Sequence, residues 1–207
     1  MRSRVRNAQS LVHWGVATVA LQGQSESGDL HMVKAVTDGV LIAVVDGLGH
    51  GEEAAAAARI AVAALERYAE EPPLSLVQQC HVALKGSRGV VMSVARFDVP
   101  RGTMTWLGVG NVEGVLHHAN WSERSGRASL VTRGGILGGE VPAVQAAVIP
   151  VGAGDTLVFA TDGISSDFLA DVSAREEPQR LADQILARHG KGTDDALVLV
   201  ARYRGAQ

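Results

Sequence analysis

The sequence predicts an α+β fold with largely antiparallel sheets. Helical patterns occur in two places only, residues 52–85 and 177–189, and short apolar segments separated by Gly- and Pro-containing turns dominate between them. Clustered helices with hairpins between them favour this class over a regular alternation of strands and helices. The length of 207 residues favours one domain, 1–207, with a substantial core.

The first part of the chain is expected to form three strands. They are predicted at residues 11–21, 31–36 and 40–45, with a polar turn at 22–28 and a hairpin turn at 37–39. The third is the clearest, because six consecutive apolar residues, Val40 to Val45, indicate a strand buried on both faces.

Two helices are expected next, at residues 52–70 and 75–85. The first carries Glu52 and Glu53 in its opening turn, where the helix dipole favours acids. Its many alanines leave little side-chain bulk, so it can pack closely against a sheet. Pro72-Pro73 is expected to end it, and Ser75 to cap the second helix.

The second half is predicted to be rich in strands and to contain one more helix, at 177–189. The strands are expected at 89–99, 103–109, 112–118, 144–151, 155–160 and 196–203, with 130–132 extended and a polar loop at 120–127. Turns at 100–102 and 152–154 predict two hairpins, 89–99 with 103–109 and 144–151 with 155–160. The glycine-rich segment 134–139 is expected to be a flexible loop.

Composition narrows the classes of partner and compartment. A net charge of −3 gives no reason to expect a nucleic-acid partner. The single cysteine, Cys80, cannot form an internal disulfide, which favours a reducing compartment, and we expect a cytoplasmic protein. No apolar stretch approaches the ~20 residues of a membrane span. Arginines before residues 11–21 give the outline of a secretory signal, but His13 and Trp14 interrupt its apolar run.

Carboxylates stand beside glycine or another acid at four predicted strand edges. These are Gly28-Asp29, Asp46-Gly47, Asp162-Gly163 and Asp194-Asp195. Carboxylates delivered by separate strands to one edge suit an oxygen-only site for magnesium or manganese, and no Cys or His cluster has zinc spacing. The alternative, four independent turns, stays open on chemistry alone.

The order of these motifs resembles a known enzyme family. The runs are Gly28-Asp29, Asp46-Gly47-Leu48-Gly49-His50-Gly51, Gly108-Val109-Gly110-Asn111-Val112-Glu113, Thr161-Asp162-Gly163-Ile164 and Asp194-Asp195. Over nearly the whole chain they resemble the metal-dependent serine/threonine phosphatases of type 2C (PPM type), in their bacterial branch. Within that branch the similarity is to phosphatases of the stressosome.

The resemblance implies a four-layer α/β/β/α sandwich of two antiparallel β-sheets flanked by helices, with two Mn²⁺ or Mg²⁺ ions at one end. Asp46 would bridge both ions, the Gly47 carbonyl would ligate one, and Asp162 and Asp194 would complete the set of ligands. These three acids would be the catalytic residues. Asp29 would bind through water or a third ion. The ions would activate a water that attacks phosphorus directly.

The resemblance also implies a substrate, namely phosphoserine or phosphothreonine on STAS-domain proteins of a stressosome, in a general stress response. We expect a monomer without a nucleic-acid or membrane partner. Selectivity is expected from surface loops beside the acids, residues 22–28 and the segment from Arg133 to Gly139.

Departures from the family keep some alternatives open. Leu48 stands where eukaryotic members have a His, and His50, two residues further on, is favoured as an ordinary loop residue. No match to their phosphate-binding Arg is apparent, so metals and glycine-rich backbone would position the phosphate. The alternatives are an inactive phosphatase-like scaffold that binds phosphorylated partners and a solute-binding or structural module. A haloacid-dehalogenase-type phosphatase is a further alternative, but it would need an Asp at Leu48.

Overall fold

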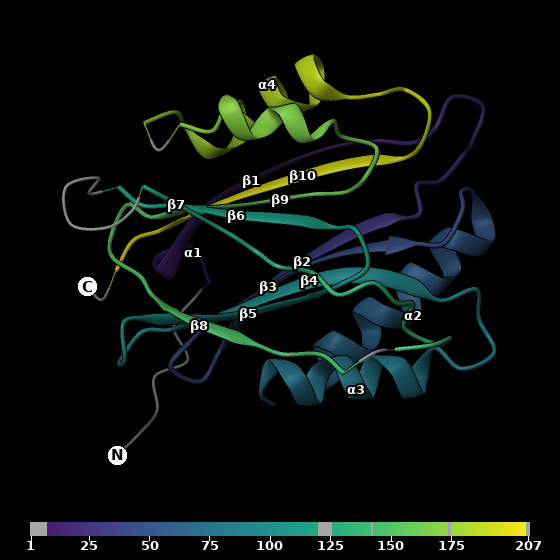
Figure 1. Cartoon of the computed structure of the whole chain (residues 1–207), viewed down its shortest axis with the longest axis horizontal. Helices are drawn as coiled ribbons and strands as arrows, with labels where there is room; N and C mark the ends of the chain where they lie inside the picture. Colours follow the sequence, from purple (N-terminus) through teal and green to yellow (C-terminus); the bar gives the residue numbers. More distant parts are fainter. Residues whose placement is uncertain (1–7, 120–125, 142, 174, 206–207) are drawn as a thin grey trace.

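The computed structural model describes residues 8–119, 126–141, 143–173 and 175–205. Two five-stranded sheets, in which all strand pairs are antiparallel, stack face to face, and helices cover the outer face of each (Figure 1). The predicted α+β sandwich is therefore confirmed. None of the described helices is long and apolar enough to cross a membrane.

The first sheet is made mainly of strands from the second half of the chain. Its order is β1 (Val12–Val19), β10 (Ala196–Tyr203), β9 (Thr156–Ala160), β6 (Glu113–His117) and β7 (Arg127–Ser129). Helix α4 (Pro178–His189) covers its outer face over β1 and β10. A 3₁₀ helix, η1 (Ser166–Ala170), and a short helix, α1 (Ala8–Leu11), were not predicted.

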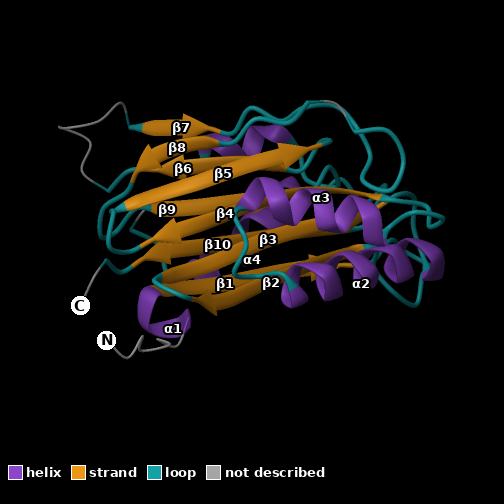
Figure 2. Ribbon diagram, turned by 90° about the horizontal axis from the view of Figure 1, so that it is seen from below, coloured by secondary structure: helices purple, strands orange, loops and turns teal. Residues whose placement is uncertain are grey.

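The second sheet contains the doubly buried strand predicted at residues 40–45, and two helices cover its outer face (Figure 2). Its order is β2 (Asp29–Val36), β3 (Gly39–Gly47), β4 (Val90–Asp98), β5 (Thr103–Val109) and β8 (Ala147–Pro150). The helices are α2 (Glu52–Arg67) and α3 (Pro73–Ala83). Helix α3 begins at Pro73 and not at Ser75, because proline fits the first helical position, where no N–H partner is needed.

Strand β3 is buried on both faces, as predicted, and this fixes where its last residues point. Val40, Ile42 and Val44 pack into the core between the sheets, whereas the alternate residues pack against α2 and α3. Asp46 continues the inner row and Gly47 the outer one. A Cβ at Gly47 would lie 2.2 Å from the carbonyl oxygen of Ala54, so only glycine lets α2 start this close to the strand.

The predicted hairpin of residues 144–151 with 155–160 is wrong. Strand β8 pairs with β5 in the second sheet, whereas β9 lies between β10 and β6 in the first. The turn between them passes from one sheet to the other: Val151 N donates to Gly102 O, and Gly154 N donates to Tyr203 O. A glycine turn between two apolar segments does not by itself distinguish a hairpin from such a crossing.

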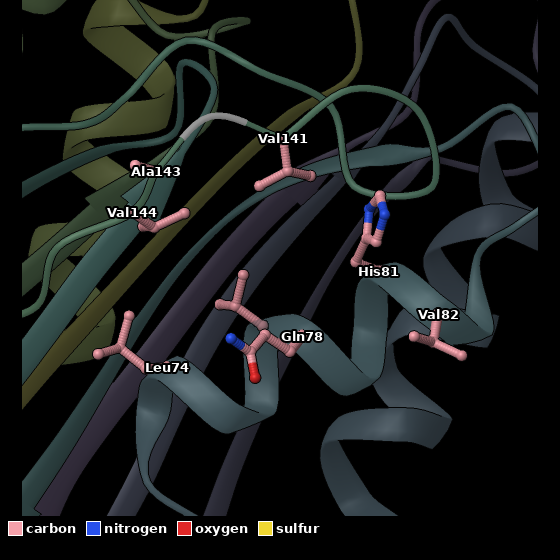
Figure 3. Close-up of a pocket in the computed structure, with 8 residues that line it drawn as sticks. Leu74, Gln78, His81, Val82, Val141, Ala143 and Val144 are labelled. Carbon is pink, nitrogen blue, oxygen red and sulfur yellow. The ribbon is translucent and has the colours of Figure 1, made fainter.

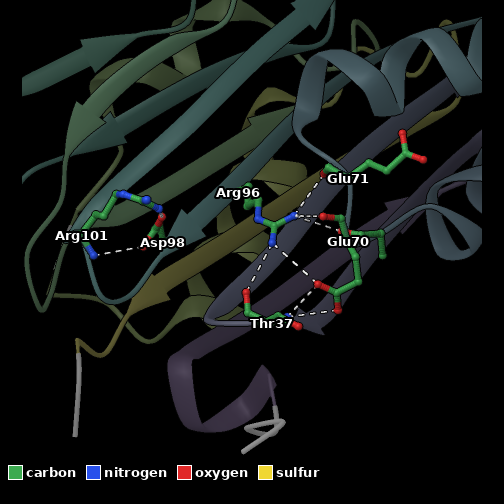
Figure 4. Close-up of polar contacts among 7 residues, drawn as sticks. Thr37, Glu70, Glu71, Arg96, Asp98 and Arg101 are labelled. Carbon is green, nitrogen blue, oxygen red and sulfur yellow. Dashed lines mark hydrogen bonds and ion pairs between the residues drawn. The ribbon is translucent and has the colours of Figure 1, made fainter. Parts of the chain in front are cut away.

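Arg96 joins the end of α2 to the β2–β3 turn (Figure 4). Its Nη1 donates to the carbonyls of Ala69, Glu70 and Glu71 at 3.4, 3.0 and 3.1 Å, and its Nη2 to Thr37 O at 3.3 Å. The Glu70 carboxylate in turn accepts Thr37 N. A cation at the carbonyl end of a helix also complements the helix dipole. Arg96 on β4 therefore fixes the far end of the helix whose beginning packs on Gly47.

We expect Arg96→Ala to lower the free energy of unfolding by about 2–3 kcal/mol, because several carbonyls lose a charged donor at once. The matched control is Arg101→Ala, which removes a more exposed arginine. Its partner, Asp98, is only three residues away, so this change should leave the free energy of unfolding unchanged. Urea unfolding of both variants measures this. Equal losses in the two variants would contradict the assigned role of Arg96.

Candidate metal centre

The acids singled out in the sequence lie at one end of the sandwich. Asp29 and Asp46 are directly opposite each other on β2 and β3. Asp162 follows β9 and Asp194 precedes β10, which are neighbours in the facing sheet. The acids lie close enough together that Asp162 and Asp194 raise the pKa values of both Asp29 and Asp46. The turns are therefore not independent of one another.

Three of these acids share an open hollow of about 400 Å³. It is lined by Asp46, Leu48, Gly49, Val91, Gly110, Asn111, Gly134, Ile136, Asp162 and Asp194. Asp29 is buried and is not among these residues, and neither is Gly47. The Gly47 carbonyl lies against Gly28, where an added Cβ would stand 3.3 Å from it. The ligand roles predicted for these five residues stay a prediction.

Hydrogen bonds fix two of the carboxylates. Thr161 Oγ1 donates to Asp29 Oδ2 at 2.8 Å, and Asn111 Nδ2 donates to Asp162 Oδ2 at 2.7 Å. Within the described part of the chain, no donor contacts the carboxylate of Asp46. Asp46 is thus open to a ligand on the hollow side, while its neighbours are held in place.

The carboxylates make each other harder to ionise. Burial, followed by repulsion from Asp29 and the other acids, raises the pKa of Asp46 to about 8. Burial raises the pKa of Asp29 to about 7 despite the hydrogen bond from Thr161. Burial and the charge of Asp194 raise the pKa of Asp162 as well. A divalent cation in the hollow would favour the ionised form of all of them.

The donor set fits Mg²⁺ or Mn²⁺, because these ions prefer oxygen ligands. Among the described residues, no three His, Cys, Asp or Glu side chains surround one point closely enough to enclose an ion by themselves. That is compatible with Mg²⁺, which keeps several of its waters and binds through one or two carboxylates.

Asp195 differs from Asp194, although the two are adjacent in the sequence. It is buried, and its oxygens accept the backbone N–H groups of Leu21 and Gly28, both at 2.7 Å. These bonds hold the ends of the loop before β2 against the first sheet. Asp194 is only partly buried and lines the hollow. This geometry favours Asp194 as the ligand and Asp195 as the residue that fixes the loop.

The glycine-rich segment 134–139 is not the flexible loop that was predicted. Leu137 is fully buried and exchanges two backbone hydrogen bonds with Val90, at 2.9 and 3.1 Å. Arg133 N donates to Gly108 O, and Gly138 N donates to His81 Nδ1 of α3. The segment is held in place by Leu137, one of the two apolar residues between its glycines, and a high glycine content alone does not predict this. The segment forms a fixed wall of the hollow.

Three polar residues around the acids received no role from the sequence, although two of them, Asn111 and Thr161, belong to its motifs. Thr161 could have been found from strand period, since it continues the inward row of Leu157 and Phe159. Asn111 was noted only as part of a motif. Lys191, whose Nζ donates to the backbone carbonyl of Asp162 at 2.6 Å, gave no signal. His50 is exposed in the loop before α2, as expected of a loop residue.

A larger hollow, of about 520 Å³, lies beside α3 and shares no residue with the carboxylate hollow (Figure 3). Its described lining is mostly apolar and includes Leu74, Val77, Val82 and Val144. His81 and Gln78 are its polar members. Of these two hollows, only the smaller one is lined by carboxylates.

We expect the metal-free protein to lose stability as the pH rises from about 4 to 8. The unfolded chain releases the Asp46 proton near pH 4, whereas the folded chain holds it until about pH 8, so the folded state binds more protons in this interval. Added Mn²⁺ should flatten this dependence. Melting temperatures in chelator and in Mn²⁺ between pH 5 and 8.5 measure it. A metal-free stability that rises with pH would contradict the assigned repulsion.

Two Asp→Asn changes should have opposite effects on the metal-free protein at pH 8. Asp46→Asn removes a repelling charge and should raise the free energy of unfolding by on the order of 2 kcal/mol. Asp195→Asn cannot accept both backbone N–H groups and should lower it by about 1–3 kcal/mol. Urea unfolding in the presence of chelator measures both free energies. A loss of stability in Asp46→Asn would contradict the assigned repulsion between the acids.

Comparison with known proteins identifies the family of this chain. A family model described as Stage II sporulation protein E (SpoIIE) matches residues 37–204. Phosphoserine phosphatase RsbX of Bacillus subtilis (strain 168) is 33% identical over 96 residues, which are 46% of this chain and 48% of the relative. This alignment therefore spans about half the length of the curated relative.

Solved structures agree on the fold. A chain described under "The bacterial stressosome: a modular system that has been adapted to control secondary messenger signaling" is 32% identical, with a TM-score of 0.83 over 92% of this chain and 99% of that one. RsbX in complex with magnesium is 23% identical, with a TM-score of 0.82 over 93% and 96%. The SiaA-PP2C domain of Pseudomonas aeruginosa is 19% identical, with a TM-score of 0.75 over 92% and 86%. The chain belongs to the SpoIIE family and has the fold of PP2C phosphatase domains.

Proposed function

We propose that this chain is a metal-dependent protein serine/threonine phosphatase. The observation that carries the proposal is the hollow at the end of the sandwich, where Asp46 from one sheet faces Asp162 and Asp194 from the other. The name phosphoserine phosphatase of the relative RsbX supports the reaction, and the magnesium complex of RsbX supports the need for a divalent ion.

In the proposed mechanism Asp46, Asp162 and Asp194 would hold two Mn²⁺ or Mg²⁺ ions, and the Gly47 carbonyl and Asp29 would be further oxygen donors. When bound, the ions supply a water acidic enough to act as a nucleophile at neutral pH. Asn111 keeps the Asp162 carboxylate oriented, and Thr161 does the same for Asp29. The backbone hydrogen bonds between Leu137 and Val90 fix one wall of the hollow.

The proposed substrates are phosphoserine and phosphothreonine of STAS-domain proteins in a stressosome, within a general stress response. The stressosome description of one similar structure supports this assignment. An open hollow also suits a phosphoryl group carried on a folded protein. The exposed Arg133 stays a candidate for contact with that protein. We further propose that the chain works as a monomer in the cytoplasm.

The second candidate, an inactive scaffold that binds phosphorylated partners, is less well supported. A scaffold of this kind is expected to have lost a metal-binding acid, and none of the four acids is lost. Turnover of a phosphorylated substrate separates the two functions directly.

Turnover of p-nitrophenyl phosphate and of a phosphoserine peptide should vanish in chelator and return with Mn²⁺. Asp46→Asn should reduce kcat by at least about 100-fold, because it removes a carboxylate that would hold the metal ions. The matched control is Asp38→Asn, an exposed acid at a positive φ of 60° that Asn also tolerates, and it should keep full activity. Activity that survives exhaustive chelation would contradict the proposal.

A further inference from the structure

Arg88 lies beside Gly49, one of the residues that line the carboxylate hollow. Its Nη1 lies 2.8 Å from the position that a Cβ on Gly49 would occupy, and Gly49 lines the hollow. The next residue, Gly89, accepts a backbone hydrogen bond from Leu48 N at 3.1 Å. The backbone beside Arg88 is therefore tied to the loop that follows Asp46, and its guanidinium is directed over that loop.

The partner of Arg88 within the chain is an exchangeable one. Its Nε forms an ion pair with Glu53 in the first turn of α2. The side chains are 49% and 70% exposed, and ion pairs between exposed side chains contribute little free energy. A more strongly charged anion that arrives at the hollow can therefore replace Glu53 at small cost.

The other cations around the hollow are less suited to an incoming anion. Lys191 donates its ammonium to the carbonyl of Asp162 at 2.6 Å, on the side of the first sheet. Arg133 is exposed at the start of the glycine-rich wall, and its backbone is fixed to Gly108. The guanidinium of Arg88 touches a residue that lines the hollow, and its planar fork matches phosphoryl oxygens.

We propose that Arg88 is a substrate-recognition residue whose guanidinium binds the phosphoryl oxygens of the phosphorylated side chain, with Glu53 as the anion that it releases. This inference rests on the proposed phosphatase function. It supplies the phosphate-binding arginine that the sequence resemblance did not locate, from a different part of the chain. Because Glu53 lies in α2 and Arg88 in the segment before β4, both elements would take part in substrate binding.

The test compares Arg88→Ala and Arg88→Lys with Arg59→Ala. Arg59 is the matched control, because it is also an exposed arginine that pairs with a glutamate, Glu26, at 2.7 Å. In Mn²⁺, Arg88→Ala should raise KM for both p-nitrophenyl phosphate and a phosphoserine peptide roughly 10- to 100-fold, as loss of a charged hydrogen bond predicts. Arg88→Lys should recover part of this loss, and Arg59→Ala should match the wild type.

A binding measurement keeps the inference separate from the proposed function. Inorganic phosphate should raise the melting temperature of the Mn²⁺-loaded wild type, with an apparent affinity that falls about tenfold or more in Arg88→Ala and rises in Glu53→Gln. If no variant or wild type turns over substrate, the proposed function fails, and phosphate binding still decides the role of Arg88. Unchanged phosphate affinity in Arg88→Ala, or an equal loss in Arg59→Ala, would overturn the inference.

Discussion

Two carboxylates, Asp29 and Asp46, lie directly opposite each other on neighbouring antiparallel strands, and the facing sheet adds Asp162 and Asp194 at the same end. Like charges in this position destabilise a sheet, and burial strengthens their repulsion. Burial, and after it repulsion from Asp29 and the other acids, raises the pKa of Asp46 to about 8. The folded protein must therefore hold protons or bind cations at this end. The core between the sheets consists mostly of apolar side chains, so the cost of these acids falls on one end of the sandwich.

The way these acids are held follows from strand geometry and from small residues. Asp46 extends the inward row of Val40, Ile42 and Val44, and glycine at position 47 lets the start of α2 pack against the strand end. Gly28, directly before β2, has the same function, since a Cβ there would approach the Cβ of Ala54 to 2.9 Å. Hydrogen bonds from Thr161 and Asn111 then fix individual carboxylates. Close backbone packing thus places the strand ends that carry the acids, and side-chain hydrogen bonds orient the individual carboxylates.

The sequence predicted those features that depend on local pattern. The doubly buried strand before Asp46, the alanine-rich helix and the position of each acid at a strand edge were all recognisable from residues near one another in the chain. The hairpin at residues 144–160 was wrong, because strand partners are chosen by the two sheets and not by the turn. The fixed wall around Leu137 and the contacts of Arg96 and Arg88 join residues far apart in sequence, which no local pattern encodes.

The central claim is that carboxylate repulsion at this end is relieved by a divalent cation. Calorimetric titration of Mn²⁺ at pH 7, repeated in two buffers of different ionisation enthalpy, measures it by counting the protons released on binding. The account predicts saturable binding with release of protons from the wild type, and much weaker binding with less release from Asp46→Asn, whose wild-type carboxylate has a pKa of about 8. Binding without proton release, or equal binding by the two proteins, would contradict it.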